Sequence, residues 1–254
     1  MPEYLLRYSG ATWAPSRAGG LALGALWAFG LAAAMFLWLP SIDLWVSNLL
    51  TGADGRFDTR SLALEIPRTL FQVIYFGILG IAILGFAGLI YIRRSMGGRS
   101  AQRWLFLALA LVMGPGLVAN VALKDQMGRA RPKQIEMFGG ERSFTPALVP
   151  AKQCAKNCSF VSGEASSMFA VFFALALLVP TRYWQFISAA LIAGGTAGLI
   201  RMAQGAHFLS DIVFAGIFMA LTTALLFILM FELVPLVSRV MAARLRPIPI
   251  EARR

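Results

Sequence analysis

Histidine, cysteine and charged side chains are all scarce in this sequence. One histidine and two cysteines occur among 254 residues, and 14% of the residues are charged whereas 58% are hydrophobic. A single water-soluble domain of this length could not bury so many apolar residues, so that class is excluded. Two cysteines with no histidine nearby in the sequence also make a poor zinc site, and we expect no metal and no other cofactor.

Apolar runs that could cross a bilayer are, in contrast, abundant. A transmembrane helix needs about 20 mostly apolar residues. The sequence predicts an all-α, polytopic membrane protein with a single domain over residues 1–254 and six transmembrane helices. The six predicted spans are residues 19–40, 69–92, 104–123, 165–180, 184–200 and 212–235.

Acidic residues are few, with 12 against 23 lysines and arginines. The basic excess lies in short connections between spans and not on one folded face, which argues against a nucleic-acid partner and for membrane lipids. Because cytoplasmic connections carry such an excess, the arginines after the second and sixth spans predict that both termini are cytoplasmic. These arginines are Arg93, Arg94, Arg99, Arg103, Arg239, Arg244, Arg246, Arg253 and Arg254.

The segment between the third and fourth spans departs from this charge pattern. Residues 124–164 are predicted to be external, yet they hold seven basic residues against four acidic ones. We interpret the positive charge as a site for an anion. Cys154 and Cys158 lie in the same segment, where an oxidising compartment would allow them to form a disulfide. Two free thiols are the alternative, because this spacing suits only some backbone geometries.

Three polar clusters interrupt the apolar helices, and the predicted topology places all of them at external helix ends. They read KDQMGRARP from residue 124, SFVSGEAS from residue 159 and RMAQGAHFLSD from residue 201. The cationic groups of Lys124, Arg131 and Arg201 are suited to phosphate oxygens. Ser162 and Gly163 begin a predicted helix, whose free N–H groups also favour an anion. Singly, such residues are more often snorkelling side chains and helix caps; together they predict a phosphate site.

The only histidine, His207, lies four residues before Asp211. If this turn is helical, the carboxylate faces the ring and accepts a hydrogen bond from one nitrogen, so that the other nitrogen can act as a nucleophile. A polar residue at the membrane interface with no catalytic role is the alternative.

These residues resemble the three signature motifs of the type 2 phosphatidic acid phosphatase superfamily, whose members are membrane enzymes that dephosphorylate lipids without a metal. The resemblance covers residues 124–211, the predicted catalytic region. It implies that His207 attacks phosphorus to form a phosphohistidine and that Asp211 orients His207. It also implies which residues bind the phosphate oxygens: Lys124, Arg131, Ser162, Gly163 and Arg201.

One position departs from the superfamily pattern. The second motif usually reads Pro-Ser-Gly-His and its histidine protonates the leaving oxygen, whereas this sequence has Glu164 at that position. A glutamate has an ordinary pKa of about 4.3, against about 6.5 for histidine, so Glu164 needs a raised pKa to act as the acid. Burial would raise its pKa and nearby cations would lower it. The alternative is a first-turn acid that only complements the helix dipole.

The stretches around the motifs, such as CAKNCSFVSGEAS, are most similar to the lipid A 4'-phosphatase branch, in which an acidic residue can occupy this position. That resemblance implies a phosphorylated lipid substrate, lipid A, and a site on the periplasmic face of the inner membrane of Gram-negative bacteria. Polyprenyl diphosphate and phosphatidylglycerophosphate are substrates of neighbouring branches, and a lipid phosphotransferase would share every motif.

Two further features concern how a lipid reaches the site. Apolar residues recur with helical spacing after the first span and predict a helix along the external interface, which would flank substrate entry or simply cover the bundle. They are Ile42, Trp45, Val46, Leu49 and Leu50. Pro115 is expected to bend the third span ahead of Lys124.

Overall fold

The computed structural model of the chain describes residues 16–59, 61–91 and 99–244, and within these ranges the protein is built from helices without a β-strand. The all-α prediction is therefore confirmed. The longer helices are α1 (Arg17–Trp38), α2 (Ser41–Asn48), α3 (Leu62–Tyr91), α4 (Arg99–Leu111), η2 (Val112–Lys124), α5 (Gly163–Leu178), α6 (Tyr183–Ala203), α7 (Leu209–Phe227), η6 (Ile228–Leu233) and α8 (Val234–Arg244). Three single helical turns lie in the connections: η3 (Pro132–Gln134), η4 (Glu136–Phe138) and η5 (Pro180–Arg182).

Among the described residues, five helical stretches have the length and apolar composition to cross a membrane. They are Arg17–Trp38, Leu62–Tyr91, Ser100–Lys124, Pro180–Ala203 and Leu209–Ser238. The remaining predicted span corresponds to α5, which has only 16 residues. α5 packs against α3, α4, α6 and α7, and most of its side chains are buried inside the bundle. The sixth membrane crossing stays a prediction.

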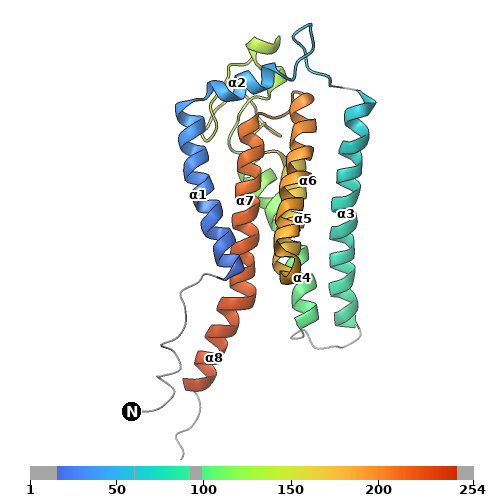
Figure 1. Cartoon of the computed structure of the whole chain (residues 1–254), viewed down its shortest axis with the longest axis vertical. Helices are drawn as coiled ribbons and strands as arrows, with labels where there is room; N and C mark the ends of the chain where they lie inside the picture. Colours follow the sequence, from blue (N-terminus) through green and yellow to red (C-terminus); the bar gives the residue numbers. More distant parts are fainter. Residues whose placement is uncertain (1–15, 60, 92–98, 245–254) are drawn as a thin grey trace, which may run out of the picture.

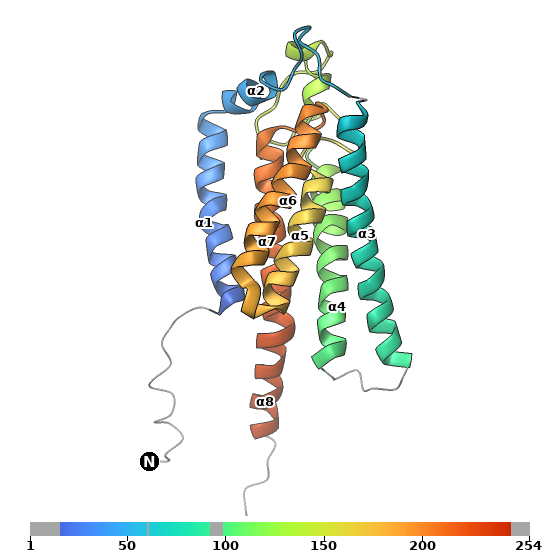
Figure 2. The ribbon, with the colours of Figure 1, turned by 45° about the vertical axis from the view of Figure 1, so that its right-hand side comes forward.

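The long helices run side by side, and α2 lies across one end of the bundle (Figures 1 and 2). The loop 125–162 gathers at this same end, which we call the α2 end. α1 begins and α8 ends at the opposite end (Figure 1). Which end is cytoplasmic stays a prediction, because five of the arginines on which it depends lie outside the described residues. These are Arg93, Arg94, Arg246, Arg253 and Arg254.

Glycines allow α6 to approach its neighbours closely. A Cβ atom at Gly194 would lie 2.6 Å from the ring of Phe169 on α5, which is closer than side chains approach in proteins. At Gly198, a Cβ atom would collide with Ile212 on α7. Close packing of this kind holds helices together in a bilayer, where the lipid is as apolar as the side chains. The close packing at these two glycines brings the ends of α5, α6 and α7 together at the α2 end.

The second and third spans differ in detail from the prediction. α3 begins at Leu62, seven residues before the predicted start, because the helix continues past the apolar run into a polar turn that carries Glu65 and Arg68. In the third span, α4 gives way at Val112 to the wider turns of a π-helix, which contains Pro115. Proline has no N–H to donate and disturbs the α-helical pattern, and a π-helical segment accommodates it.

The predicted interfacial helix is present as α2, and Ile42, Val46 and Leu50 of its apolar stripe pack against the core. Trp45 and Leu49, from the apolar stripe, are mostly exposed, whereas Asp43 and Ser47 are almost completely enclosed. The reason is that Asp43 accepts hydrogen bonds from inside the fold. α2 is therefore attached to the bundle by a buried charge in addition to apolar contacts.

Candidate active site

The three polar clusters predicted from the sequence meet at the α2 end. Lys124 is the last residue of η2, and Arg201 lies in the last turn of α6. Ser162 caps α5, of which Gly163 is the first residue. His207 lies in the short connection between α6 and α7. The ends of four helices thus supply one site.

His207 is buried, and its two ring nitrogens have different surroundings. Nδ1 lies 2.6 Å from the backbone carbonyl oxygen of Ser159. Nε2 is enclosed and has no hydrogen-bond partner among the described residues. Because a carbonyl oxygen can only accept, Nδ1 carries the proton, which leaves a lone pair on Nε2. Burial lowers the pKa of His207 while the Asp211 carboxylate acts in the opposite direction, and the net shift favours the neutral ring.

The predicted contact between Asp211 and His207 differs from what the structure contains. α7 begins at Leu209, so His207 is not on the same helical turn as Asp211, and Oδ2 lies 3.6 Å from Nδ1, beyond hydrogen-bond distance. The carboxylate instead accepts hydrogen bonds from the Ser159 hydroxyl at 2.5 Å and from the Phe208 N–H at 2.8 Å. Ser159 therefore links the two residues, with its carbonyl group on His207 and its hydroxyl group on Asp211.

Arg129 belongs to the same network, although sequence reasoning does not find it. Its side chain is enclosed and donates to Oδ1 of Asp211 at 2.6 Å. It also donates to Oδ2 of Asp43 at 2.8 Å and to the Ser210 hydroxyl at 2.8 Å. The only signal in the sequence is its place two residues before Arg131. Its carboxylate partners are 82 and 86 residues away, and no local pattern reveals them.

Three cations share the region next to His207. Lys124 and Arg201 are nearly enclosed, each with 8% of its surface exposed, and Arg131 lies within electrostatic range of both. Nε of Arg201 is enclosed without a hydrogen-bond partner in the described part of the chain. This N–H group makes an ion pair with Glu164 but no hydrogen bond, so it can still donate to a phosphate oxygen.

The start of α5 adds backbone donors to these cations. A Cβ atom at Gly163 would lie 3.2 Å from Nζ of Lys124 and 3.1 Å from Oδ1 of Asn120, so a larger residue would crowd both side chains. The Ser162 hydroxyl accepts from the Ala165 N–H at 3.4 Å and thus acts as a helix cap. Because the first N–H groups of a helix lack partners within the helix, this end favours an anion.

Glu164 lies in the first turn of α5, between two arginines. Its Oε1 is 3.3 Å from Nε of Arg201 and 3.3 Å from Nε of Arg68. Two guanidinium groups stabilise the ionised carboxylate, which cannot donate a proton. Glu164 must therefore take up a proton before it can act as the acid. Arg68 is absent from the predicted site because it lies one residue before the predicted second span.

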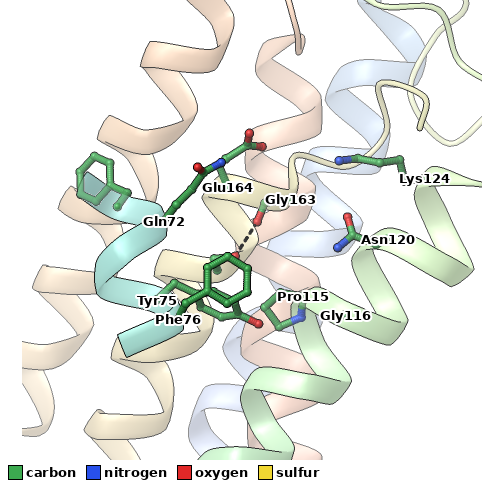
Figure 3. Close-up of a pocket in the computed structure, with 11 residues that line it drawn as sticks. Gln72, Tyr75, Phe76, Pro115, Gly116, Asn120, Lys124, Gly163 and Glu164 are labelled. Atoms are coloured by element: carbon green, nitrogen blue, oxygen red, sulfur yellow. Dashed lines mark hydrogen bonds between the residues drawn. The ribbon is translucent and has the colours of Figure 1, made fainter. Parts of the chain in front are cut away.

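A cavity of about 340 Å³ opens next to these residues, between α3, η2 and α5. Figure 3 shows Lys124 on the η2 side of this cavity, and Tyr75 and Phe76 on the α3 side. Glu164 lines its polar part, and Pro115 adds to its apolar wall. A cationic end next to an aromatic and aliphatic wall suits a molecule that combines phosphate with hydrocarbon.

Cys154 and Cys158 are joined by a disulfide, with their Cα atoms 5.6 Å apart. Inside the loop that the disulfide closes, the Asn157 carbonyl oxygen accepts a hydrogen bond from Nη2 of Arg131 at 2.8 Å. The Asn157 N–H donates to Oδ1 of Asp125 at 3.1 Å. The disulfide thus constrains the loop that positions Arg131.

Several known proteins are similar to this chain in sequence. A lipid A 4'-phosphatase of Francisella tularensis subsp. novicida is 47% identical over 129 residues, which are 50% of this chain and 58% of that relative, so the chain covers less than two thirds of it. A lipid A 4'-phosphatase of Rhizobium leguminosarum is 35% identical over 74% of this chain and 86% of the relative. The crystal structure of a transmembrane PAP2-type phosphatidylglycerolphosphate phosphatase from Bacillus subtilis, 18% identical, aligns over 91% of this chain and 98% of its own with a TM-score of 0.44.

The family model of the PAP2 superfamily matches residues 103–235, which is more than half of the chain and contains all three polar clusters. With this match and the R. leguminosarum relative, the chain belongs to the PAP2 superfamily.

Proposed function

We propose that the protein is a metal-independent lipid phosphatase of the membrane that removes the 4'-phosphate of lipid A. The relatives named lipid A 4'-phosphatase, at 47% and 35% identity, support this substrate. The reaction itself is supported by the site, because a nitrogen nucleophile and several phosphate-binding cations lie together at one end of the bundle.

The observation that carries the proposal is the buried Nε2 of His207. It has a free lone pair and no hydrogen-bond partner among the described residues, and the ring lies within electrostatic range of Lys124. Cations that bind the phosphate oxygens also stabilise the negative charge that develops on them during attack. These cations take the part that a metal ion plays in other phosphatases.

The reaction proceeds in two steps. Nε2 of His207 forms a bond to phosphorus, and the bond from phosphorus to the lipid oxygen breaks. The Ser159 carbonyl oxygen keeps the ring oriented through Nδ1–H, and the nearby Asp211 carboxylate stabilises the positive charge of the phosphohistidine. Water then attacks phosphorus, the bond from phosphorus to nitrogen breaks, and inorganic phosphate leaves. The phosphate oxygens are held by Lys124, Arg131, Ser162, Gly163 and Arg201.

The leaving lipid oxygen needs a proton, and Glu164 is the candidate donor. It stands at the position that a histidine occupies in the usual superfamily motif. A bound phosphate dianion carries like charge, which favours uptake of a proton by the carboxylate. The protonated acid then transfers that proton to the departing oxygen.

We also propose six membrane crossings, both termini in the cytoplasm, and a site on the periplasmic face of the inner membrane of a Gram-negative bacterium. Support comes from α1 beginning and α8 ending at the same end of the bundle (Figure 1) and from the disulfide, which forms in oxidising compartments. The substrate phosphate then reaches the cavity from the headgroup layer while the acyl chains stay in the bilayer.

The test is phosphate release by the detergent-purified protein, with His207→Ala as the control. Lipid A, phosphatidylglycerophosphate and undecaprenyl diphosphate are supplied in parallel, and the lipid products are identified by mass spectrometry. Loss of the 4'-phosphate from lipid A supports the proposal. Preference for another lipid would overturn the substrate and keep the chemistry, and release that persists in the His207→Ala protein would overturn the mechanism.

A further inference from the structure

Arg68 contributes a charge to the site from α3, a helix outside the three motifs. Its Nε lies 3.3 Å from Oε1 of Glu164. Its Nη1 lies 3.0 Å from Oε2 and 3.3 Å from Oε1 of Glu65, one helical turn earlier. The guanidinium group therefore binds two carboxylates with two different nitrogens. Glu65 holds Arg68 in place, and Arg68 in turn holds Glu164.

The contacts of Arg68 belong to a closed ring of five side chains. Glu65 accepts from Nε2 of Gln204 at 2.8 Å, and Oε1 of Gln204 accepts from Nη1 of Arg201. Nε of Arg201 lies 3.3 Å from Oε1 of Glu164, which closes the ring. We call this set, which comes from α3, α5 and the end of α6, the ion-pair ring. Its members are Glu65, Arg68, Glu164, Arg201 and Gln204.

Within the ion-pair ring, one oxygen of Glu164 is shared between two arginines with different tasks. Arg201 is a phosphate-binding residue of the proposed function, and its distance to Glu164 is that of an ion pair without hydrogen-bond geometry. A phosphate that enters the site competes with the Glu164 carboxylate for Arg201, because both are anions. Until it takes up the proton that the proposed reaction requires, the displaced carboxylate still needs a cation, since an unpaired charge in an enclosed site is costly.

We propose that Arg68 is a further positioning residue of the phosphate site: fixed by Glu65, it retains the Glu164 carboxylate when a phosphate takes the place of that carboxylate at Arg201. The inference rests on the proposed function, because it assumes a phosphate at Arg201. The other charged or titratable groups that face Glu164 are Lys124, Arg131 and His207, and each of them belongs to the phosphate site itself. Arg68 is thus the counter-ion that stays with Glu164.

An arginine is required for this role, and a lysine would not replace it. Lysine keeps the positive charge but has one nitrogen, which cannot reach Glu65 and Glu164 with the separate contacts that Nη1 and Nε make. Arg68→Lys therefore removes one of the two contacts and keeps the positive charge. The variant distinguishes positioning of Glu164 by Arg68 from simple electrostatic attraction between them.

The experiment measures binding of inorganic phosphate to the full-length protein in detergent by isothermal titration calorimetry. We expect Arg68→Lys to weaken phosphate binding about fivefold, because Glu164 then competes more strongly at Arg201. In a Glu164→Gln protein, Arg68→Lys should change nothing, since the competing charge is gone. Arg142→Lys is the matched control; Arg142 is exposed in the loop at the same end, and binding should be unchanged.

Equal weakening in both backgrounds would overturn the inference, because Arg68 would then act on the phosphate directly or on the fold. No weakening in the wild-type background, or no phosphate binding by the wild-type protein, would overturn it as well. The proposed function is judged separately by phosphate release from lipid. If the wild-type enzyme hydrolyses lipid A and the Arg68→Lys protein binds phosphate normally, the proposed function is supported and only the inference about Arg68 is overturned.

Discussion

The two sides of the site differ in how firmly their acidic residues are held. Asp211 is fully buried and accepts bonds of 2.5 to 2.8 Å from Ser159, Arg129 and the Phe208 backbone. Glu164 lies at the edge of a cavity, with two arginines at 3.3 Å. In the proposed function, the part of the site around His207 and Asp211, the nucleophile side, is therefore organised before the substrate arrives. The part around Glu164 and Arg201, the phosphate side, would exchange an internal carboxylate for the substrate. Preorganisation is most useful where charge develops, and mobility where a ligand must enter.

The largest expected effect is at the nucleophile. His207→Ala should lower lipid phosphate release by at least about a thousandfold, because the sequence has no second histidine that could form the phosphohistidine. Folding should be retained, since the contacts of Asp211 with Arg129 and Ser159 do not need the imidazole ring. Activity is measured as phosphate release, and thermal unfolding in detergent is the control. Activity within tenfold of the wild type would contradict the proposed role.

The second largest effect is expected for Arg129, which binds the two buried carboxylates beside His207. Arg129→Met leaves the buried carboxylates of Asp43 and Asp211 without their cation, which should cost about 3–5 kcal/mol of stability. The unfolding temperature in detergent should fall by several degrees and activity should fall with it. Adding Asp43→Asn to this variant removes one unpaired charge and should recover part of the loss. An unchanged unfolding temperature would show that the network is not a main source of stability.

A smaller effect is expected on the phosphate side. Glu164→Gln should slow hydrolysis of the lipid phosphate by about a hundredfold, because an alkoxide leaves poorly without a proton donor. An aryl phosphate, whose oxygen leaves readily without a proton, is the matched control and should be hydrolysed at nearly the normal rate. If the lipid is also hydrolysed at a near-normal rate, Glu164 is not the donor.

The smallest expected effect is a shift in the pH dependence of activity and of stability, caused by the lowered pKa of His207. Burial lowers the pKa of His207 from its ordinary value of about 6.5, and the neutral ring is the reactive form. The acid limb of kcat/KM should therefore lie below pH 6.5. The same shift makes the unfolded chain bind more protons than the folded one below that pH, so stability falls as pH decreases through about 6.5. An acid limb above pH 7 would contradict a neutral, buried His207.

The sequence is sufficient to predict which polar residues meet at the candidate site, and it misses the residues whose contribution depends on a distant partner. Lys124, Arg201 and His207 interrupt apolar helices and are noticeable for that reason. Arg129 and Arg68 lie in polar stretches where basic residues are ordinary, and their importance comes from carboxylates that the fold brings to them. On α2, three residues of the apolar stripe pack against the core as a stripe should, but nothing in the local sequence shows that Asp43 is buried with Arg129.

The shortness of α5 has a consequence for the depth at which the reaction takes place. Its 16 residues make a helix about 24 Å long, whereas the hydrocarbon layer of a bilayer is about 30 Å thick. In the proposed orientation, the end of α5 that carries Gly163 then lies about one helical turn below the membrane surface. Because longer helices surround α5 and most of its side chains are buried, this recess lies inside the protein. In the proposed function, a phosphorylated lipid would thus extend its headgroup into the recessed site while its acyl chains stay in their leaflet.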